Sequence, residues 1–267
     1  MKIGICRSAD DFGGIKTGKA AGADFLEVSF DELGDYDEAK ATFCKSKYDE
    51  IGIECYSAKN FIPSSHKIVG GAVDYAALAA YLEKGFSIAA ILGIKVVVFG
   101  SGGARSADDV ALTEAYGQLV DFTRDYVSPI AAKYGVTVVF EPLKASETKL
   151  IHTVKDGVTA AEDVNRANVS ALADLYHMVQ NGDEIGNICD FTGKIFHSHI
   201  REPFDRTFPL ETDSAESKAF YKCFFKALMA AGCETCAIES RAADFCDVIA
   251  PSMKYLKSLV KECEKEL

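Results

Sequence analysis

The chain has 267 residues, of which 48% are hydrophobic, and its formal net charge at pH 7 is −11. This length suits a single domain over residues 1–267, because one α/β barrel typically needs about 250 residues. The acidic balance disfavours nucleic acid as a partner, since a negatively charged surface repels a phosphate backbone. Lysine and arginine are scattered and form no basic patch.

The start of the chain and its nine cysteines indicate a reducing setting. The chain opens directly into a strand-like run, KIGIC, without an apolar signal segment, and we expect no apolar run of the roughly 18 residues that span a bilayer. Cys6, Cys55 and Cys236 lie in apolar runs, where a free cysteine behaves as a small hydrophobe. We therefore expect reduced thiols, a cytoplasmic location and no membrane partner.

Strand-like and helix-like segments alternate from one end of the chain to the other. The predicted strands cover residues 2–6, 24–30, 53–58, 95–100, 136–141, 169–175, 194–200 and 235–240. The predicted helices cover residues 13–22, 36–50, 74–92, 108–134, 155–166, 183–192, 214–231 and 245–265. Capping residues support the helix starts, namely Asp74, Ser106 and either Asp213 or Ser214.

Eight strands and eight helices in strict alternation predict parallel strands with right-handed crossovers, closed into a single-domain (β/α)8 TIM barrel. An open doubly wound sheet is the alternative, but eight regular units in this length favour closure. The longest connections, residues 59–73, 142–154 and 201–213, all follow strands. We expect these loops at the C-terminal face, where barrels bind their substrates.

Four consecutive predicted strands end on residues that can bind a metal ion. These residues are Glu141, Asp174, His199 and Glu239, spaced by 33, 25 and 40 residues. Neighbouring strand ends meet at one face of a barrel, so the four side chains can converge on one point. Three carboxylates and one imidazole form a hard, oxygen-rich site suited to Mn²⁺, Mg²⁺ or Co²⁺. One glutamate at a strand end is usually solvated, but four such ends in a row are a much stronger signal.

Several segments resemble the xylose isomerase-like TIM barrels. They are FEPLKASETKLIHTV, LADLYHM, FHSHIREPFDR and AIES, together with VVVFGSGGAR after the fourth strand. The closest pattern is that of the ketose 3-epimerases that act on D-tagatose and D-psicose. The resemblance covers the order of all eight units, and its specific motifs lie in the second half of the chain. It implies a metal-dependent isomerase or epimerase acting on a sugar or a sugar phosphate.

The resemblance also implies how the four strand-end residues work. Glu141, Asp174, His199 and Glu239 would hold one divalent ion, with Mn²⁺ favoured over Co²⁺, Mg²⁺ and Zn²⁺. Glu141 and Glu239 would be the catalytic pair. One would take the proton from a carbon of the metal-bound sugar to give a cis-enediolate, and the other would return a proton to the opposite face. Their pKa values would then lie nearer neutrality than usual.

Further residues are implied as substrate contacts. Glu147 in EPLKASE matches the family's substrate-binding glutamate, with a solvated loop carboxylate as the alternative. His177 matches the histidine of an Asp-x-x-His motif, with a residue that caps the next helix as the alternative. Glu202 fits the family's spacing, but the arginine that should follow it is displaced. Arg206 comes one residue late and Arg201 is an extra candidate, which indicates a different substrate.

Two loops supply the remaining expected contacts, Asn60 after the third strand and Ser101 in the glycine-rich segment GSGGAR. That segment could cradle a phosphate through its backbone N–H groups, or it could be a tight turn with Arg105 facing outward. It lacks the Lys-Ser/Thr of a nucleotide-binding loop. His197 alternates with His199 along one strand, so both can face the interior, and we expect His197 to be a hydrogen-bonded core residue.

Other functions stay open beside the isomerase. A dehydratase of the same barrel group, such as those acting on inososes, would lose a β-hydroxyl after the same proton abstraction. A phosphodiesterase like the DNA-repair endonucleases of this superfamily would need many more ligands than five histidines provide, and a basic face. A non-catalytic sugar-binding barrel would not need both Glu141 and Glu239. We expect a small carbohydrate as the ligand, and a homo-oligomer is compatible with the sequence.

Overall fold

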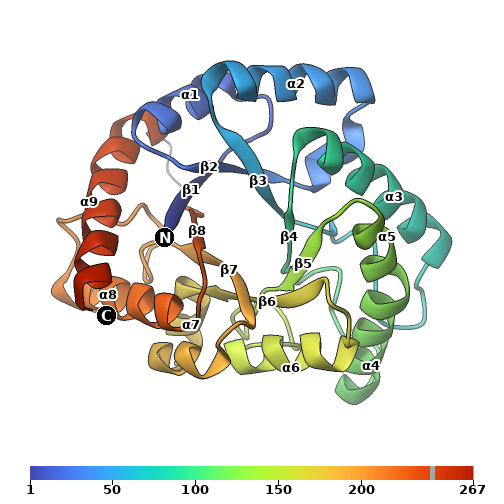
Figure 1. Cartoon of the computed structure of the whole chain (residues 1–267). Helices are drawn as coiled ribbons and strands as arrows, with labels where there is room; N and C mark the ends of the chain where they lie inside the picture. Colours follow the sequence, from blue (N-terminus) through green and yellow to red (C-terminus); the bar gives the residue numbers. More distant parts are fainter. Residues whose placement is uncertain (241–243, 267) are drawn as a thin grey trace.

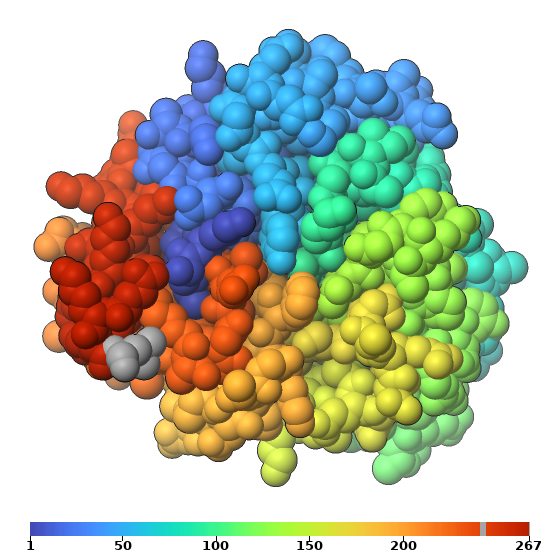
Figure 2. All heavy atoms as spheres, in the orientation of Figure 1, coloured from blue at the N-terminus to red at the C-terminus, as the bar shows by residue number. Residues whose placement is uncertain are grey.

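All eight strand-like runs form strands, which close into one parallel barrel in the order β1 to β8 (Figure 1). The computed structural model describes residues 1–240 and 244–266. Closure pairs Lys2 of β1 with Thr235 of β8, so the blue start of the chain lies beside its orange-red end (Figure 2). The predicted (β/α)8 barrel is confirmed. The strands are β1 Lys2–Cys6, β2 Phe25–Ser29, β3 Glu54–Lys59, β4 Val96–Phe99, β5 Thr137–Phe140, β6 Val169–Asp174, β7 Ile195–Ile200 and β8 Thr235–Ile238.

Helices form a ring around the barrel (Figure 1). Asp74 and Ser214 cap α3 and α8 as predicted, each accepting a backbone N–H of the first turn. Ser106 does not cap a helix, because α4 begins later, behind Ala111. The helices are α1 Phe12–Ala20, η1 Asp31–Asp35, α2 Glu38–Ile51, α3 Tyr75–Leu92, α4 Leu112–Phe122, η2 Thr123–Val127, α5 Ser128–Lys133, α6 Val154–Val164, α7 Leu175–Asn181, η3 Ile185–Phe191, α8 Ala215–Ala230 and α9 Phe245–Glu266.

Two predicted helices differ from the structure. The helix expected at 108–134 starts at Leu112 and is divided by the π-helical turn η2, with a proline at the start of α5. The helix expected at 183–192 is a 3₁₀ helix, η3, and α7 precedes it without having been predicted. Helix α7 begins directly after β6 because Asp174 is both the last strand residue and the N-cap.

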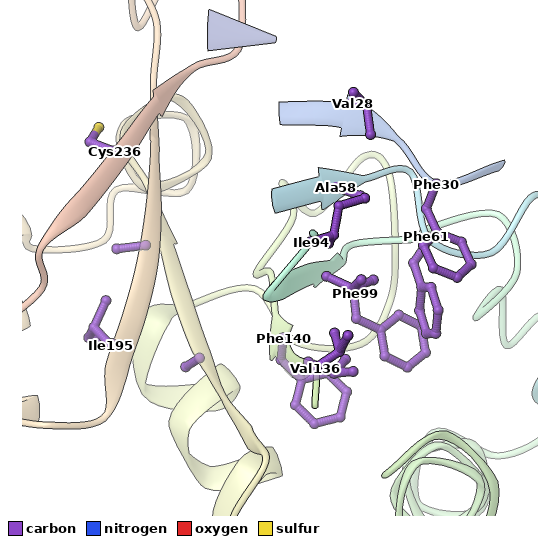
Figure 3. Close-up of a cluster of buried hydrophobic side chains, with 14 of the residues drawn as sticks. Val28, Phe30, Ala58, Phe61, Ile94, Phe99, Val136, Phe140, Ile195 and Cys236 are labelled. Carbon is purple, nitrogen blue, oxygen red and sulfur yellow. The ribbon is translucent and has the colours of Figure 1, made fainter. Parts of the chain in front are cut away.

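Alternation along the strands separates an outer core from the barrel interior. Outward side chains pack under the helices, and Phe30, Phe61, Phe99 and Phe140 form a continuous row of rings (Figure 3). The ring centroids of successive members lie 5.0, 5.1 and 5.4 Å apart. Inside the barrel the apolar cluster is small, and it consists of Val96, Val98, Val139 and Leu172. The rest of the interior therefore has room for polar side chains.

Among the described helices, α3 alone is long and apolar enough to cross a membrane. The expectation that the chain contains no such apolar run is therefore wrong. In this fold α3 belongs to the ring around the barrel, and its Phe86 packs edge-on against Phe30 with 5.1 Å between ring centroids. All nine cysteines are unpaired, as reduced thiols would be.

Candidate active site

The four predicted ligands come together at the C-terminal ends of β5 to β8. Ligand atoms of Glu141, Asp174, His199 and Glu239 all lie within 4.8 Å of one another. Nδ1 of His199 lies 3.1 Å from Oε1 of Glu141, and 3.8 Å from both Oδ2 of Asp174 and Oε2 of Glu239. The expected convergence is confirmed. Three carboxylate oxygens around one imidazole nitrogen are a donor set that fits a hard divalent cation.

Local backbone features determine where two of these ligands point. As the N-cap of α7, Asp174 uses Oδ1 to accept the His177 N–H at 2.9 Å, which leaves Oδ2 facing the other ligands. Gly100 follows β4 beside Glu141, and a Cβ at this position would overlap Oε2 of that carboxylate. The glycine after VVVF is therefore needed for the space that Glu141 occupies.

Two cations hold the carboxylate of Glu239 through its two oxygens. Nζ of Lys59 lies 2.9 Å from Oε1, and Nη2 of Arg201 lies 2.8 Å from Oε2. The same Nη2 donates to Oδ2 of Asp174 at 2.9 Å, so Arg201 links two of the four ligands. Burial alone would raise the pKa of Glu239, but Lys59 and Arg201 outweigh it and hold that pKa well below its usual range. The expected shift towards neutrality is therefore wrong for Glu239 when no metal ion is bound.

The imidazole of His199 is fully buried among acidic groups. Burial alone would lower its pKa, but the nearby Glu27 and the contact with Glu141 raise the pKa well above its usual value. Without a metal ion, the ring is therefore protonated at neutral pH. A cation that binds at Nδ1 has to displace a proton.

A pocket of about 430 Å³ lies against Glu141 and Glu239, and six of the predicted substrate contacts line it. Three of these residues have left-handed backbones, with φ of 54° at Asn60, 46° at Ser101 and 66° at Arg206. Such conformations cost a non-glycine residue about 1–3 kcal/mol and cluster at functional sites. The predicted contacts that line the pocket are Asn60, Ser101, Glu147, His177, Arg201 and Arg206.

The side of the pocket near α7 is polar and cationic. Glu147 lies 3.5 Å from Nη2 of Arg206 and 3.5 Å from Nζ of Lys144. The guanidinium of Arg206 lies over the ring of Tyr176, 4.3 Å from its centroid. His177 is buried, and its Nδ1 accepts the Lys144 N–H at 3.1 Å. This side of the pocket therefore offers positive charge, negative charge and a histidine ring to the hydroxyl groups of a sugar.

Glu202 and Arg105, which both lie in segments that resemble the family, hold other parts of the site in place. Glu202 does not line the pocket, because its carboxylate accepts the Phe204 N–H at 2.6 Å and the Ser217 hydroxyl at 2.6 Å, which holds the loop after β7. Arg105 is fully buried and donates to the carbonyl oxygen of Glu141 at 3.0 Å. The alternative in which Arg105 faces outward is therefore wrong, and its side chain supports the end of β5.

Sequence reasoning missed Lys59 and Glu27. Lys59 ends β3, so its place at a strand end was an available signal, but a search for metal ligands passes over lysine. Glu27 lies in the middle of β2, in FLEVS, and is fully buried. A charged residue between apolar neighbours of a strand was the available signal for an inward polar position.

A second group of potential ligands lies inside the barrel. Glu27, His197 and His199 also offer ligand atoms within 4.8 Å of one another. His197 already uses both nitrogens, with Nδ1 at 2.8 Å from Oγ1 of Thr235 and Nε2 at 2.9 Å from Oε2 of Glu27. His197 is therefore the hydrogen-bonded core residue that its position predicted.

The barrel and its strand-end ligands agree with a family assignment. Residues 15–259 match the family described as xylose isomerase-like TIM barrel, and the chain belongs to that family. It is 27% identical to D-psicose 3-epimerase from Agrobacterium fabrum over 197 residues, which cover 68% of this chain and 64% of that protein. The match thus spans slightly less than two thirds of the relative's length.

Solved structures share the fold over the whole chain. L-ribulose 3-epimerase superposes with a TM-score of 0.84 at 18% identity, covering 100% of this chain and 97% of that one. The 3-keto-D-glucoside 4-epimerase from E. coli superposes with a TM-score of 0.79 at 20% identity, covering 97% of this chain and 99% of that one. At these identities the likeness shows the fold, and the chemistry has to be argued from the residues.

Proposed function

We propose that this protein is a sugar epimerase or isomerase that depends on one divalent metal ion, with Glu141 and Glu239 as its acid and base. One observation carries the proposal. Both carboxylates line the same pocket, and both face the same nitrogen of His199. Glu141, Asp174, His199 and Glu239 would hold the ion, for which Mn²⁺ suits the donor set. The bound ion would supply a Lewis acid that polarises the sugar carbonyl.

The chain's own groups then divide the work of binding and proton transfer. Glu141 would take the proton from the substrate, because it lines the pocket and, among the described residues, no lysine or arginine lies at ion-pair distance from its carboxylate. Glu239 would return a proton from the other side of the substrate. His177, Glu147 and Arg206 would bind hydroxyl groups, because they line the pocket with donors and acceptors. The 3-epimerase and 4-epimerase names of the relatives support a carbohydrate substrate.

The cations on Glu239 favour a second candidate, a one-base reaction. A carboxylate whose pKa is held well below its usual range is a weak base, and Lys59 and Arg201 hold Glu239 in that state. Glu141 alone would then move the proton. A 1,2-isomerisation and a dehydration of the inosose type are both reactions of this kind.

One experiment tests the proposal and separates the two candidates. Free ketoses and ketose phosphates are incubated with the protein and Mn²⁺ in D₂O, and the products are analysed by NMR and mass spectrometry. A two-base epimerisation places solvent deuterium on the inverted carbon. An aldose or a dehydrated product identifies the one-base reaction. If no ketose reacts and dialysed protein takes up no Mn²⁺, the enzyme proposal is wrong and a sugar-binding barrel replaces it.

The charge and the cysteines of the chain bear on its location and its partners. We propose a small carbohydrate as its partner and a cytoplasmic location, with neither nucleic acid nor membrane bound. The net charge of −11 and the unpaired cysteines support this proposal.

A further inference from the structure

A carboxylate lies in the centre of the barrel without any exposure to solvent. Glu27 points inward from β2 and is 0% exposed. Oε2 accepts the Ser57 hydroxyl at 2.7 Å and lies 2.9 Å from Nε2 of His197, while Oε1 accepts the Cys6 thiol at 3.0 Å. Burying a charged carboxylate costs several kcal/mol unless it is paired, so this position needs a reason beyond packing.

His199 connects this carboxylate to the candidate metal centre. Its Nδ1 faces Glu141, Asp174 and Glu239, while its Nε2 lies 2.9 Å from Oε1 of Glu27. The contact with Glu27 is close but does not meet hydrogen-bond geometry, and Nε2 has no hydrogen-bond partner among the described residues. A carboxylate beside one imidazole nitrogen keeps a proton there, so the other nitrogen can present its lone pair to a metal ion.

Glu27 is itself held from several strands. Ser57 approaches it from β3 and His197 from β7, and Oγ1 of Thr235 in β8 holds the far side of the His197 ring at 2.8 Å. A register shift between β2 and β3 places Ser57 opposite Glu27. These contacts leave the carboxylate little freedom to move away from His199.

We propose that Glu27 is a positioning residue of the metal centre, which fixes the His199 ring with Nε2–H towards β2 and Nδ1 towards the three carboxylate ligands. The inference rests on the proposed function, because it assumes that the four strand-end residues bind a metal ion. Glu27 would touch neither metal nor substrate and would act through His199. The rival is a second ion held by Glu27, His197 and His199, which the engaged nitrogens of His197 oppose.

The first test compares Mn²⁺ binding to the wild type, Glu27→Gln and Ser57→Ala by calorimetry. Glu27→Gln keeps the shape of the side chain and loses its charge. Ser57→Ala is the matched control, since it removes a neutral partner of the same carboxylate. We expect about 10–100-fold weaker binding in Glu27→Gln at an unchanged stoichiometry of roughly one ion, and a clearly smaller loss in Ser57→Ala, which loosens the carboxylate but keeps its charge. Thermal unfolding of the metal-free variants reports whether each one folds.

The outcomes separate this inference from the proposed function. Unchanged affinity in Glu27→Gln overturns the inference alone, and a stoichiometry of two overturns it in favour of the second ion. A wild type that binds no Mn²⁺ overturns the proposed function together with the inference.

A second measurement needs no folded variant at position 27. Long-range ¹H–¹⁵N NMR of the histidine-labelled wild type, loaded with diamagnetic Zn²⁺, reports which nitrogen of each ring carries the proton. The His199 signal is assigned with the spectrum of His199→Gln. We expect a proton on Nε2 of His199 and none on Nδ1. A proton on Nδ1 would show that the ring binds metal through its other nitrogen, and the proposal would be wrong.

Discussion

The two halves of the barrel contribute to the candidate site in different ways. Strands β5 to β8 end on the four ligands, whose oxygen and nitrogen atoms would contact a metal ion directly. Strands β2 and β3 contribute Glu27 and Lys59, which contact the ligands His199 and Glu239, and Lys59 also lines the pocket. The ligand half therefore supplies the atoms that would bind a metal ion, and the supporting half, together with Arg201 after β7, sets the charge and orientation of those ligands. A search for ligand residues at strand ends detects the first kind of residue and passes over the second.

The largest expected effect lies in the ligand half. Glu141→Gln and Glu239→Gln each keep an oxygen for the metal but remove a base, so we expect turnover to fall by ~10²–10⁴-fold in each variant. Steady-state rates are measured together with metal content, so that loss of the ion is separated from loss of the base. If Glu239→Gln keeps its metal and turns over normally, Glu239 is a ligand only, and the one-base reaction becomes the better account.

Local patterns predicted the fold and the ligand half, because each of these signals lies within one segment. The eight strands followed from apolar runs, and each of the four predicted ligands followed from its place at the end of one of these strands, namely Glu141, Asp174, His199 and Glu239. Lys59 and Glu27 depend on distant partners, since 180 residues separate Lys59 from Glu239 and 170 separate Glu27 from His197. Such pairs form only when the barrel closes and the register of its strands is set.

Lys59 offers the next largest test, because it connects the two halves. Lys59→Met keeps the apolar stem and removes the cation from Glu239. Lys59 also lines the pocket, so we expect turnover to fall by about 10²–10³-fold, the range for losing one preorganised donor in an active site. The pKa of Glu239 should rise towards its usual range, which moves the acidic limb of the pH–rate profile to higher pH. Lys59→Arg is the matched control that keeps the charge, and it should recover much of the activity. A Lys59→Met enzyme with normal turnover and an unchanged pH–rate profile would show that Lys59 does not influence the chemistry of Glu239.

The pH dependence of metal binding tests whether Glu27 raises the pKa of His199. The raised pKa of His199 means that a proton competes with the ion at Nδ1. Below that pKa, the apparent affinity for Mn²⁺ should fall about tenfold per pH unit, since one proton is displaced. The lowered pKa values of Asp174 and Glu239 leave both carboxylates ionised near neutrality, so they add nothing to this slope. Calorimetry in buffers of different ionisation enthalpy counts the released proton. In Glu27→Gln, the pH below which the affinity for Mn²⁺ begins to fall should be lower than in the wild type. A wild-type affinity that does not change with pH would contradict the displacement of a proton from His199.

The smallest effect is expected at the edge of the pocket, with Glu147→Gln. Its ion pairs with Lys144 and Arg206 are 3.5 Å long and partly exposed, so their loss should change the free energy of unfolding by less than about 1 kcal/mol. A hydrogen bond to a sugar hydroxyl is worth about 0.5–1.5 kcal/mol, which predicts a KM roughly two- to tenfold higher with kcat nearly unchanged. Steady-state kinetics and a melting curve separate the two effects. Lys144→Met is the matched control, because it removes the partner of one of these two ion pairs and leaves the carboxylate in place. An equal rise of KM in both variants would mean that the loop, rather than the Glu147 carboxylate, binds the substrate.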